Sequence, residues 1–108
     1  MTVKELSEKL GFSVAALPEP EREIGGAYCG DLLSWVMGRA KADDAWITIM
    51  TNSNIVAVAS LADTACIILS EGVELDQEVK ALAEAKGVNI LGTEKPIYET
   101  AAALCGLI

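Results

Sequence analysis

The chain of 108 residues contains no histidine, 3 cysteines and 5% aromatic residues. Without histidine it lacks the commonest general base, and a Ser-His-Asp or Cys-His arrangement is impossible. A zinc site with histidine ligands is excluded, and the cysteines include no C-x-x-C pair. Cys29, Cys66 and Cys105 could hold a metal only if they met in space, and buried thiols are the simpler interpretation. We therefore expect no metal site and no histidine-dependent catalysis.

Positive charge is also scarce. The 8 Lys and Arg residues are outnumbered by 16 Asp and Glu, so the formal net charge is −8, and no basic run occurs. Nucleic acids and anionic membranes attract basic patches, so neither is an expected partner. No apolar run is long enough to span a membrane. The first residues are charged where a signal peptide would be apolar, and an odd number of scattered cysteines argues against a disulfide framework. These features predict a cytoplasmic protein.

Phosphate-binding motifs are incomplete. Gly25 and Gly30 have the spacing of a P-loop, but Asp31-Leu32 stands where that motif needs Lys followed by Ser or Thr. No G-x-G-x-x-G motif occurs. The adjacent carboxylates Asp43-Asp44 are interpreted as a solvated turn rather than a catalytic pair. We expect no cofactor.

Apolar residues, in contrast, are abundant. They make up 52% of the chain, and the mean hydropathy is +0.37. A small domain has a large surface relative to its volume, so part of this apolar content is expected to face a partner. A homodimer is the simplest such partner, because its interface needs only one self-complementary patch. Trp35, opposite Leu33 and Met37 on its predicted helix, is the candidate dimer contact. Trp46, inside an apolar strand, is expected in the core or an interface.

Local patterns predict alternating helices and strands. A capping box at Thr2 and Glu5 begins the first helix, and Gly11 ends it. Asp31 is the expected N-cap of the second helix, whose apolar face is formed by Leu32, Leu33, Val36 and Met37. Asp76 caps a later helix, Gly87 ends it, and Pro96 begins the last one. The predicted strands cover 12–17, 27–29, 45–50, 65–70 and 88–91, and helices beyond the first cover 32–40, 76–86 and 96–105.

The segment 54–61 is ambiguous. Its alternating β-branched residues favour a strand by propensity. Thr51, Ser53 and Asn54 are typical helix N-cap residues, and the run is long enough for two helical turns. We predict a helix, partly on the resemblance described below.

This order of elements indicates an α/β fold. Helices alternate with continuous apolar strands from residue 31 onward, which predicts a largely parallel sheet of about five strands in a three-layer α/β/α domain. The first two strands are joined without a helix, so one of them can run antiparallel and make the sheet mixed. The expected organisation is a single domain over residues 1–108.

Three stretches in order resemble the DRTGG domain family: Gly30-Asp31-Leu32-Leu33-Ser34-x-Val36-Met37-Gly38, Ala45-Trp46-Ile47-Thr48, and Asn54-Ile55-Val56-Ala57-Val58-Ala59. The resemblance implies a fold similar to the N-terminal domains of HPr kinase/phosphorylase and of Mur ligases. Family members also occur inside phosphotransacetylases and between CBS domains of some inorganic pyrophosphatases. The resemblance therefore implies that this chain is a stand-alone regulatory module of a kind that is often dimeric.

The chain departs from the family pattern at several positions. The acidic-Arg pair of the family name corresponds to Glu21-Arg22, and Gly25-Gly26 follows without a clear counterpart of the threonine. Members commonly read W-I-T-x-Q-x-H-x-N-I, whereas this chain has Met50 for the glutamine and Asn52 for the histidine.

A ligand is expected beyond the carboxyl ends of the parallel strands, where strand 45–50 meets helix 54–61. Free backbone N–H groups at a helix start favour an anion. The candidate ligand-binding residues are Gly25, Gly26, Asp31, Ser34, Thr48, Thr51, Asn52 and Asn54. The alternative is that these residues only form caps and turns.

Three hypotheses for function remain. The first is a non-catalytic, homodimeric regulatory module that binds a nucleotide or small anionic metabolite. The second is a pure protein–protein interaction subunit that accompanies a redox or phosphotransfer enzyme. The third is an enzyme that works without histidine, through residues such as Asp31 or Cys29.

Overall fold

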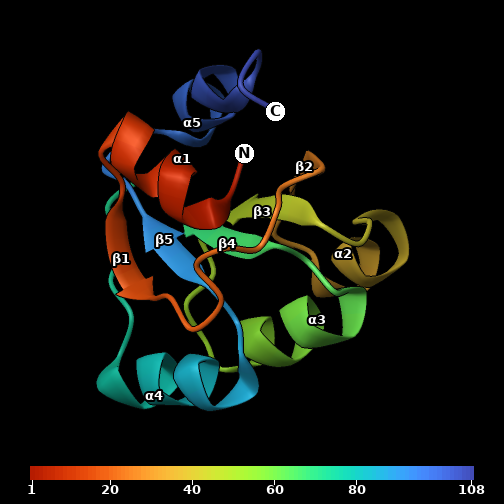
Figure 1. Cartoon of the computed structure of the whole chain (residues 1–108). Coiled ribbons are helices and arrows are strands. Elements are labelled where there is room, and N and C mark those ends of the chain that lie inside the picture. The colour runs from red at the N-terminus through yellow and green to blue at the C-terminus, as the bar shows by residue number, and fades with distance from the viewer.

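The computed structural model describes residues 1–108 and contains one five-stranded mixed sheet (Figure 1). The strands lie in the order β1-β5-β4-β3-β2. Strands β2 to β5 are parallel, and β1 pairs antiparallel with β5. Their bounds are β1 Ser13–Ala16, β2 Gly26–Cys29, β3 Asp44–Thr48, β4 Cys66–Leu69 and β5 Ile90–Gly92. This confirms the predicted α/β class and the expectation that one of the first two strands is antiparallel.

Helices cover both faces of the sheet (Figure 1). One face carries α1 (Val3–Leu10) and α5 (Ile97–Leu104). The other carries α2 (Leu33–Arg39), α3 (Asn54–Ala62) and α4 (Gln77–Lys86), each of which connects two neighbouring parallel strands. No helix is long and apolar enough to cross a membrane.

The two faces of the sheet support separate hydrophobic cores. Trp46, Ile67 and Ile90 pack toward α2, α3 and α4. Ile47, Ile68 and other alternate residues pack toward α1 and α5. Because both faces are covered, β3 and β4 are buried along their whole length. Trp46 belongs to the core, and its indole N–H donates to the Gly30 carbonyl at 2.9 Å.

Segment 54–62 is a helix, as predicted. Its buried residues are Ile55, Val56, Val58 and Ala59, whereas Ala57, Ser60 and Leu61 are exposed. This spacing is the one-sided burial of a helix and not the alternation of a strand. Packing against the sheet therefore overrides the β-propensity of the valines and the isoleucine.

The helix ends agree with the sequence in most places. Thr2 and Glu5 form the predicted capping box, and Gly11 and Gly87 are left-handed C-caps. Asp76 occupies its predicted N-cap position, but its side chain makes no capping bond. The prediction for Asp31 was wrong. Leu32 is the N-cap of α2, and no side chain caps that helix.

The predicted apolar face of α2 was also only partly correct. Val36 is fully buried and Leu33 is partly buried. Leu32 is 56% exposed and Met37 is 42% exposed, because α2 is a short helix near the edge of the sheet. Trp35 is 52% exposed, and the Arg39 guanidinium lies 3.8 Å from the centre of its ring. The helix therefore leaves a group of large apolar side chains in solvent.

Candidate functional site

At the carboxyl ends of β2 and β3, Asp31 and Thr48 join two neighbouring strands. The Thr48 hydroxyl donates to Asp31 Oδ1 at 2.6 Å, and the Ile49 N–H donates to the same oxygen at 3.1 Å. The Thr48 oxygen also accepts the Met50 N–H at 3.3 Å. Thr48 is fully buried, whereas Asp31 is exposed. Thr48 thus orients Asp31, and the second carboxylate oxygen of Asp31 makes no hydrogen bond within the chain.

The loop between β3 and α3 presents unpaired donors. The backbone N–H groups of Thr51, Asn52 and Ser53 have no partner within the chain. Asn52 Oδ1 accepts the Asn54 N–H at 2.9 Å, so the side chain forms a turn while its NH₂ group stays unpaired. These donors lie just before α3, at the positive end of that helix. The arrangement favours an anionic or carbonyl group.

The first turn of α3 is satisfied internally. Besides the bond to Asn54, the Ile55 N–H donates to the Asn52 carbonyl and the Val56 N–H to the Ser53 carbonyl. The free donors are therefore those of residues 51–53 and not those of the helix itself. The Asx turn of Asn52 fixes the direction in which this loop enters α3.

Most predicted site residues share the carboxyl end of the sheet. Asp31, Thr48, Thr51, Asn52 and Asn54 all lie there by strand order and by their hydrogen bonds. Ser34 is exposed in the first turn of α2, which begins beside Asp31.

Gly25 and Gly26 lie at the opposite, amino end of the sheet and do not join this group. The Gly25 N–H donates to the Asp43 carbonyl at 2.9 Å, and Gly26 pairs in register with Asp44. A Cβ atom at Gly26 would lie 2.8 Å from Asp44 Oδ1, which is closer than such contacts occur. Gly26 therefore leaves room for the buried Asp44 side chain, whose Oδ2 accepts the Lys41 N–H at 2.8 Å.

Arg22 dominates that amino end, and its partners could not be identified from the sequence. Its Nη2 donates to Asp43 Oδ1 at 2.8 Å and to Asp63 Oδ1 at 3.0 Å, and also to the Asp63 carbonyl at 2.7 Å. Both aspartates have positive φ, 71° and 58°, in the turns before β3 and β4. Burial would lower the pKa of Arg22, but its hydrogen bonds to Asp43 and Asp63 outweigh burial and raise the pKa. Arg22 thus joins two turns as a permanently charged clamp.

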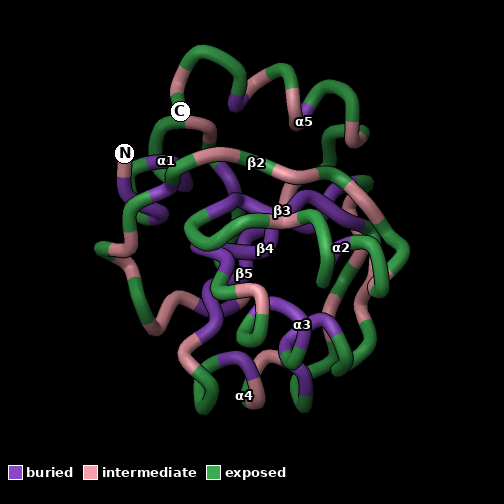
Figure 2. Tube along the Cα trace, turned by 90° about the vertical axis from the view of Figure 1, so that its right-hand side faces the viewer, coloured by how far each residue is buried: buried purple, intermediate pink, exposed green.

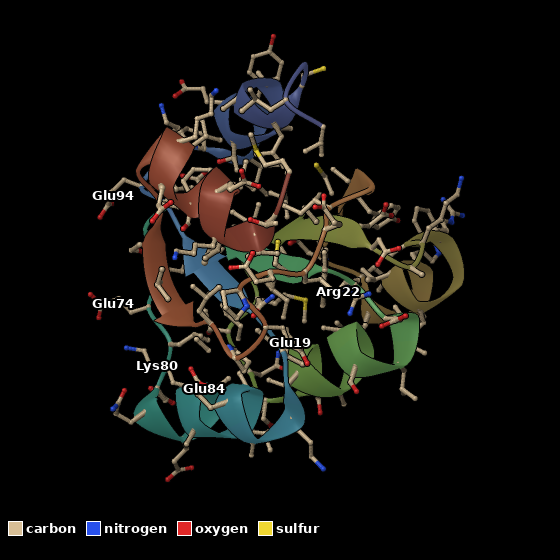
Figure 3. All side chains as sticks on the ribbon, in the orientation of Figure 1. Glu19, Arg22, Glu74, Lys80, Glu84 and Glu94 are labelled. Carbon is tan, nitrogen blue, oxygen red and sulfur yellow. The ribbon has the colours of Figure 1, made fainter.

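The hollows of the surface lie elsewhere. One of about 440 Å³ is lined by Gly72, Glu74, Glu94 and Lys95 beside the ends of β4 and β5. An adjoining hollow of about 350 Å³ follows β1 and includes Lys80. The side chains of Glu74, Glu94 and Lys80 project outward on this side of the molecule (Figure 3). None of these residues belongs to the predicted ligand site. That site, around Asp31, Thr48 and residues 51–54, lies on an open surface and not in a hollow.

Two of the three cysteines, Cys29 and Cys66, have little nucleophilic character. Burial raises the pKa of the Cys66 thiol to about 12. Burial and then the Asp31 carboxylate raise the pKa of Cys29. Both thiols therefore stay protonated near neutral pH. No three His, Cys, Asp or Glu side chains lie together as a metal-binding group.

The fold and this polar loop define a small α/β domain with binding groups at the carboxyl ends of its parallel strands. The DRTGG domain family model matches residues 28–107, and the chain belongs to the DRTGG domain family. No curated protein matches the sequence. The family match begins in β2, and the preceding α1 and β1 pack on the same sheet.

A solved structure with a similar fold contains the CBS and DRTGG domains of the regulatory region of Clostridium perfringens pyrophosphatase, complexed with the activator diadenosine tetraphosphate. The TM-score is 0.71 and the sequence identity is 15%. The match covers 95% of this chain and 45% of that chain, so this chain spans less than half of the pyrophosphatase fragment. The likeness confirms the fold.

Proposed function

We propose that the chain is a non-catalytic regulatory module that binds a nucleotide or a nucleotide-like anionic metabolite where β3 meets α3. The observation that carries this proposal is the run of three consecutive unpaired N–H groups at residues 51–53, next to the unpaired Asn52 NH₂. Oriented N–H groups at the start of a helix bind phosphate oxygens in many proteins. The domain of the same family in the pyrophosphatase belongs to a regulatory region that was crystallised with a nucleotide activator.

The position of Asp31 favours a nucleotide over a bare phosphate. Its carboxylate would repel a phosphate placed directly beside it. Its unpaired oxygen can instead accept a hydrogen bond from a sugar hydroxyl or a base amino group. A ligand with a phosphate at residues 51–53 and a hydroxyl-bearing group at Asp31 would use both sets of groups. We therefore expect diadenosine tetraphosphate or ATP to bind more tightly than inorganic phosphate.

A pair of isosteric variants tests the site. Asn52→Asp keeps the oxygen that accepts the Asn54 N–H but replaces the NH₂ donor with negative charge. Gln77→Glu makes the same amide-to-carboxylate change at an exposed position of α4 and is the matched control. In calorimetric titrations with diadenosine tetraphosphate and ATP, Asn52→Asp should raise the Kd at least about tenfold, or about 1.4 kcal/mol. Gln77→Glu should leave it unchanged. Equal affinities in both variants would contradict the assignment.

The lack of catalytic function has chemical support. The sequence provides no histidine, and the pKa values of Cys29 and Cys66 are raised. The Asp31 carboxylate is held by Thr48 and the Ile49 N–H, which favours a positioning role. A purified activity that Asp31→Asn or Cys29→Ser abolishes would overturn the non-catalytic assignment.

We also propose that the module is a homodimer, with Trp35 in the interface. Leu32 and Trp35, three residues apart at the start of α2, are large apolar side chains that are 56% and 52% exposed. Exposed groups of this kind mark association surfaces. A second candidate function, an interaction subunit of another enzyme, rests on the same surface. A stoichiometric protein partner that co-purifies with the wild type, but not with Trp35→Ala, would favour that second function.

A further inference from the structure

The outer side of β2 is an open strand edge. β2 is the last strand of the sheet, and Figure 2 shows it on the side that faces the viewer, coloured as intermediate and exposed. Residues 1–3 pair with segment 22–24 just before β2, but Ala27 and Cys29 have no such neighbour. The Gly30 N–H donates inward to the Ile47 carbonyl at 3.1 Å. Backbone groups alternate along a strand, so those of Tyr28 also point toward β3, and those of Ala27 and Cys29 point outward. Ala27 and Cys29 are exposed as well. Each therefore offers one free N–H and one free carbonyl to another strand.

The opposite edge of the sheet has the features that normally prevent such pairing. β1 has an irregular register between Val14 and Ala16. Two prolines, Pro18 and Pro20, follow it closely. β2 contains no proline, no charged residue and no register shift. Natural sheets protect free edges with bulges, prolines and charges, so the bare edge of β2 indicates a strand that is paired in the functional assembly.

The charge distribution indicates which partner pairs there. The chain carries a net charge of −8, yet segment 45–62 contains no charged residue. Segment 24–42 contains only Asp31, Arg39 and Lys41. Two copies can therefore meet along β2 and α2 without strong like-charge repulsion. An isologous contact also needs nothing beyond this surface itself.

We propose that two copies of the chain pair β2 with β2 in antiparallel orientation, about a two-fold axis at Tyr28. In this register Ala27 lies opposite Cys29 of the partner subunit, and each such pair exchanges both N–H···O bonds. The two sheets become one continuous sheet. The two α2 helices flank the seam on the same face and cover Trp35 and Leu32. This geometry rests on the proposed homodimer and specifies how it is built.

Disulfide trapping tests the register. At the axis, the two Tyr28 residues form a non-hydrogen-bonded pair with Cα atoms about 4.5 Å apart, a separation that permits a disulfide. Tyr28→Cys, in a background with Cys29→Ser and Cys105→Ser, should give a covalent dimer on mild oxidation. Val14→Cys in the same background places a thiol on the other edge and should stay monomeric on a denaturing gel. A dimeric protein in which Tyr28→Cys forms no disulfide would overturn the proposed register.

A second pair of variants tests the edge without oxidation. Ala27→Lys puts a charge on the exposed side of β2 and should raise the dimer dissociation constant at least tenfold. Val14→Lys makes a similar change at a residue of β1 that is 50% exposed and should have no effect. Light scattering across a concentration series measures both. A dimer that persists in Ala27→Lys but dissociates in Trp35→Ala would overturn edge pairing and leave the homodimer intact. A monomeric wild type would overturn both, whereas nucleotide titrations test ligand sensing separately.

Discussion

The two ends of the parallel strands differ in how completely their polar groups are paired. At the amino ends, Arg22 satisfies Asp43 and Asp63, and Gly26 allows close approach to Asp44. At the carboxyl ends, Thr48 pairs with one oxygen of Asp31, while the N–H groups of residues 51–53 remain free. A closed network stabilises the fold, whereas an open one is available to a ligand. The proposed function therefore places ligand binding at the carboxyl ends, opposite the closed network of the amino ends.

The residues that were compared with the family name, Glu21-Arg22 and Gly25-Gly26, precede the range 28–107 that the family model matches. Arg22 joins turns from separate parts of the chain, and Gly26 leaves room for the Asp44 side chain. The residues with free groups come from the stretch that follows β3, where the resemblance implies a glutamine and a histidine in place of Met50 and Asn52.

The largest effect on stability is expected at the amino end. Arg22→Ala removes hydrogen bonds to the carboxylates of Asp43 and Asp63. Both aspartates have positive φ and would lose their cationic partner. Because the group is partly exposed, we expect a loss of about 2 kcal/mol in the free energy of unfolding, with unchanged nucleotide affinity. Arg39→Ala, which removes only the contact with the Trp35 ring, should cost less than about 1 kcal/mol. Urea unfolding measures both, and equal losses would contradict the clamp.

The next effect depends on pH and concerns Cys66, at the amino end of β4. Its folded pKa of about 12 exceeds the ordinary value of 9.0. The unfolded thiol therefore ionises first, so the stabilisation is fully present below pH 9 and is lost between about pH 9 and 12. Relative to pH 8, the stability advantage of the wild type over Cys66→Ala should shrink by about 1.4 kcal/mol at pH 10. A constant difference across this range would show that the thiol is not shielded.

A smaller loss in the free energy of unfolding is expected when the Thr48 hydroxyl, which bonds to Asp31, is removed. Thr48→Val keeps the shape but loses the bonds to Asp31 and to the Met50 N–H, and should cost about 1 kcal/mol. It should also weaken nucleotide binding, because Asp31 is no longer oriented. Thr64→Val is the matched control, since the Thr64 hydroxyl makes only one long bond of 3.5 Å to the Ala59 carbonyl. Retained affinity in Thr48→Val would contradict the positioning role of Thr48.

The smallest stability effect is expected for Asn52→Asp in the absence of ligand. The turn oxygen is preserved, so the free energy of unfolding should change by no more than about 0.5 kcal/mol. Thermal unfolding without ligand measures this change. A large loss would mean that Asn52 is mainly structural and would remove the contrast between the two ends.

Much of the fold could be predicted from the sequence because its signals are local. The capping box at Thr2, the glycine stops and the continuous apolar strands are each decided by neighbouring residues. Segment 54–62 was harder, since its β-branched residues favour a strand and only packing against the sheet decides for a helix.

The site was predicted less completely because its contacts are long-range. Asp31 has the composition of an N-cap, but its carboxylate bonds to Thr48, 17 residues away. No local pattern distinguishes these two roles. Arg22 likewise finds partners 21 and 41 residues away. Gly25 and Gly26 were predicted to be near the ligand because glycine lets a ligand approach the backbone closely. The parallel pairing of β2 with β3 instead places them at the amino end of β2, away from Asp31 and Thr48.

The most direct test of the binding end is a titration of the isotope-labelled chain with diadenosine tetraphosphate, followed by amide NMR signals. The backbone signals of Thr51, Asn52 and Ser53 and the side-chain NH₂ of Asn52 should shift first and saturate together. The signals of Gly25 and Gly26 should stay in place. Shifts confined to Gly25, Gly26 and Arg22, or no shifts at millimolar ligand, would contradict the assignment of binding to the carboxyl end.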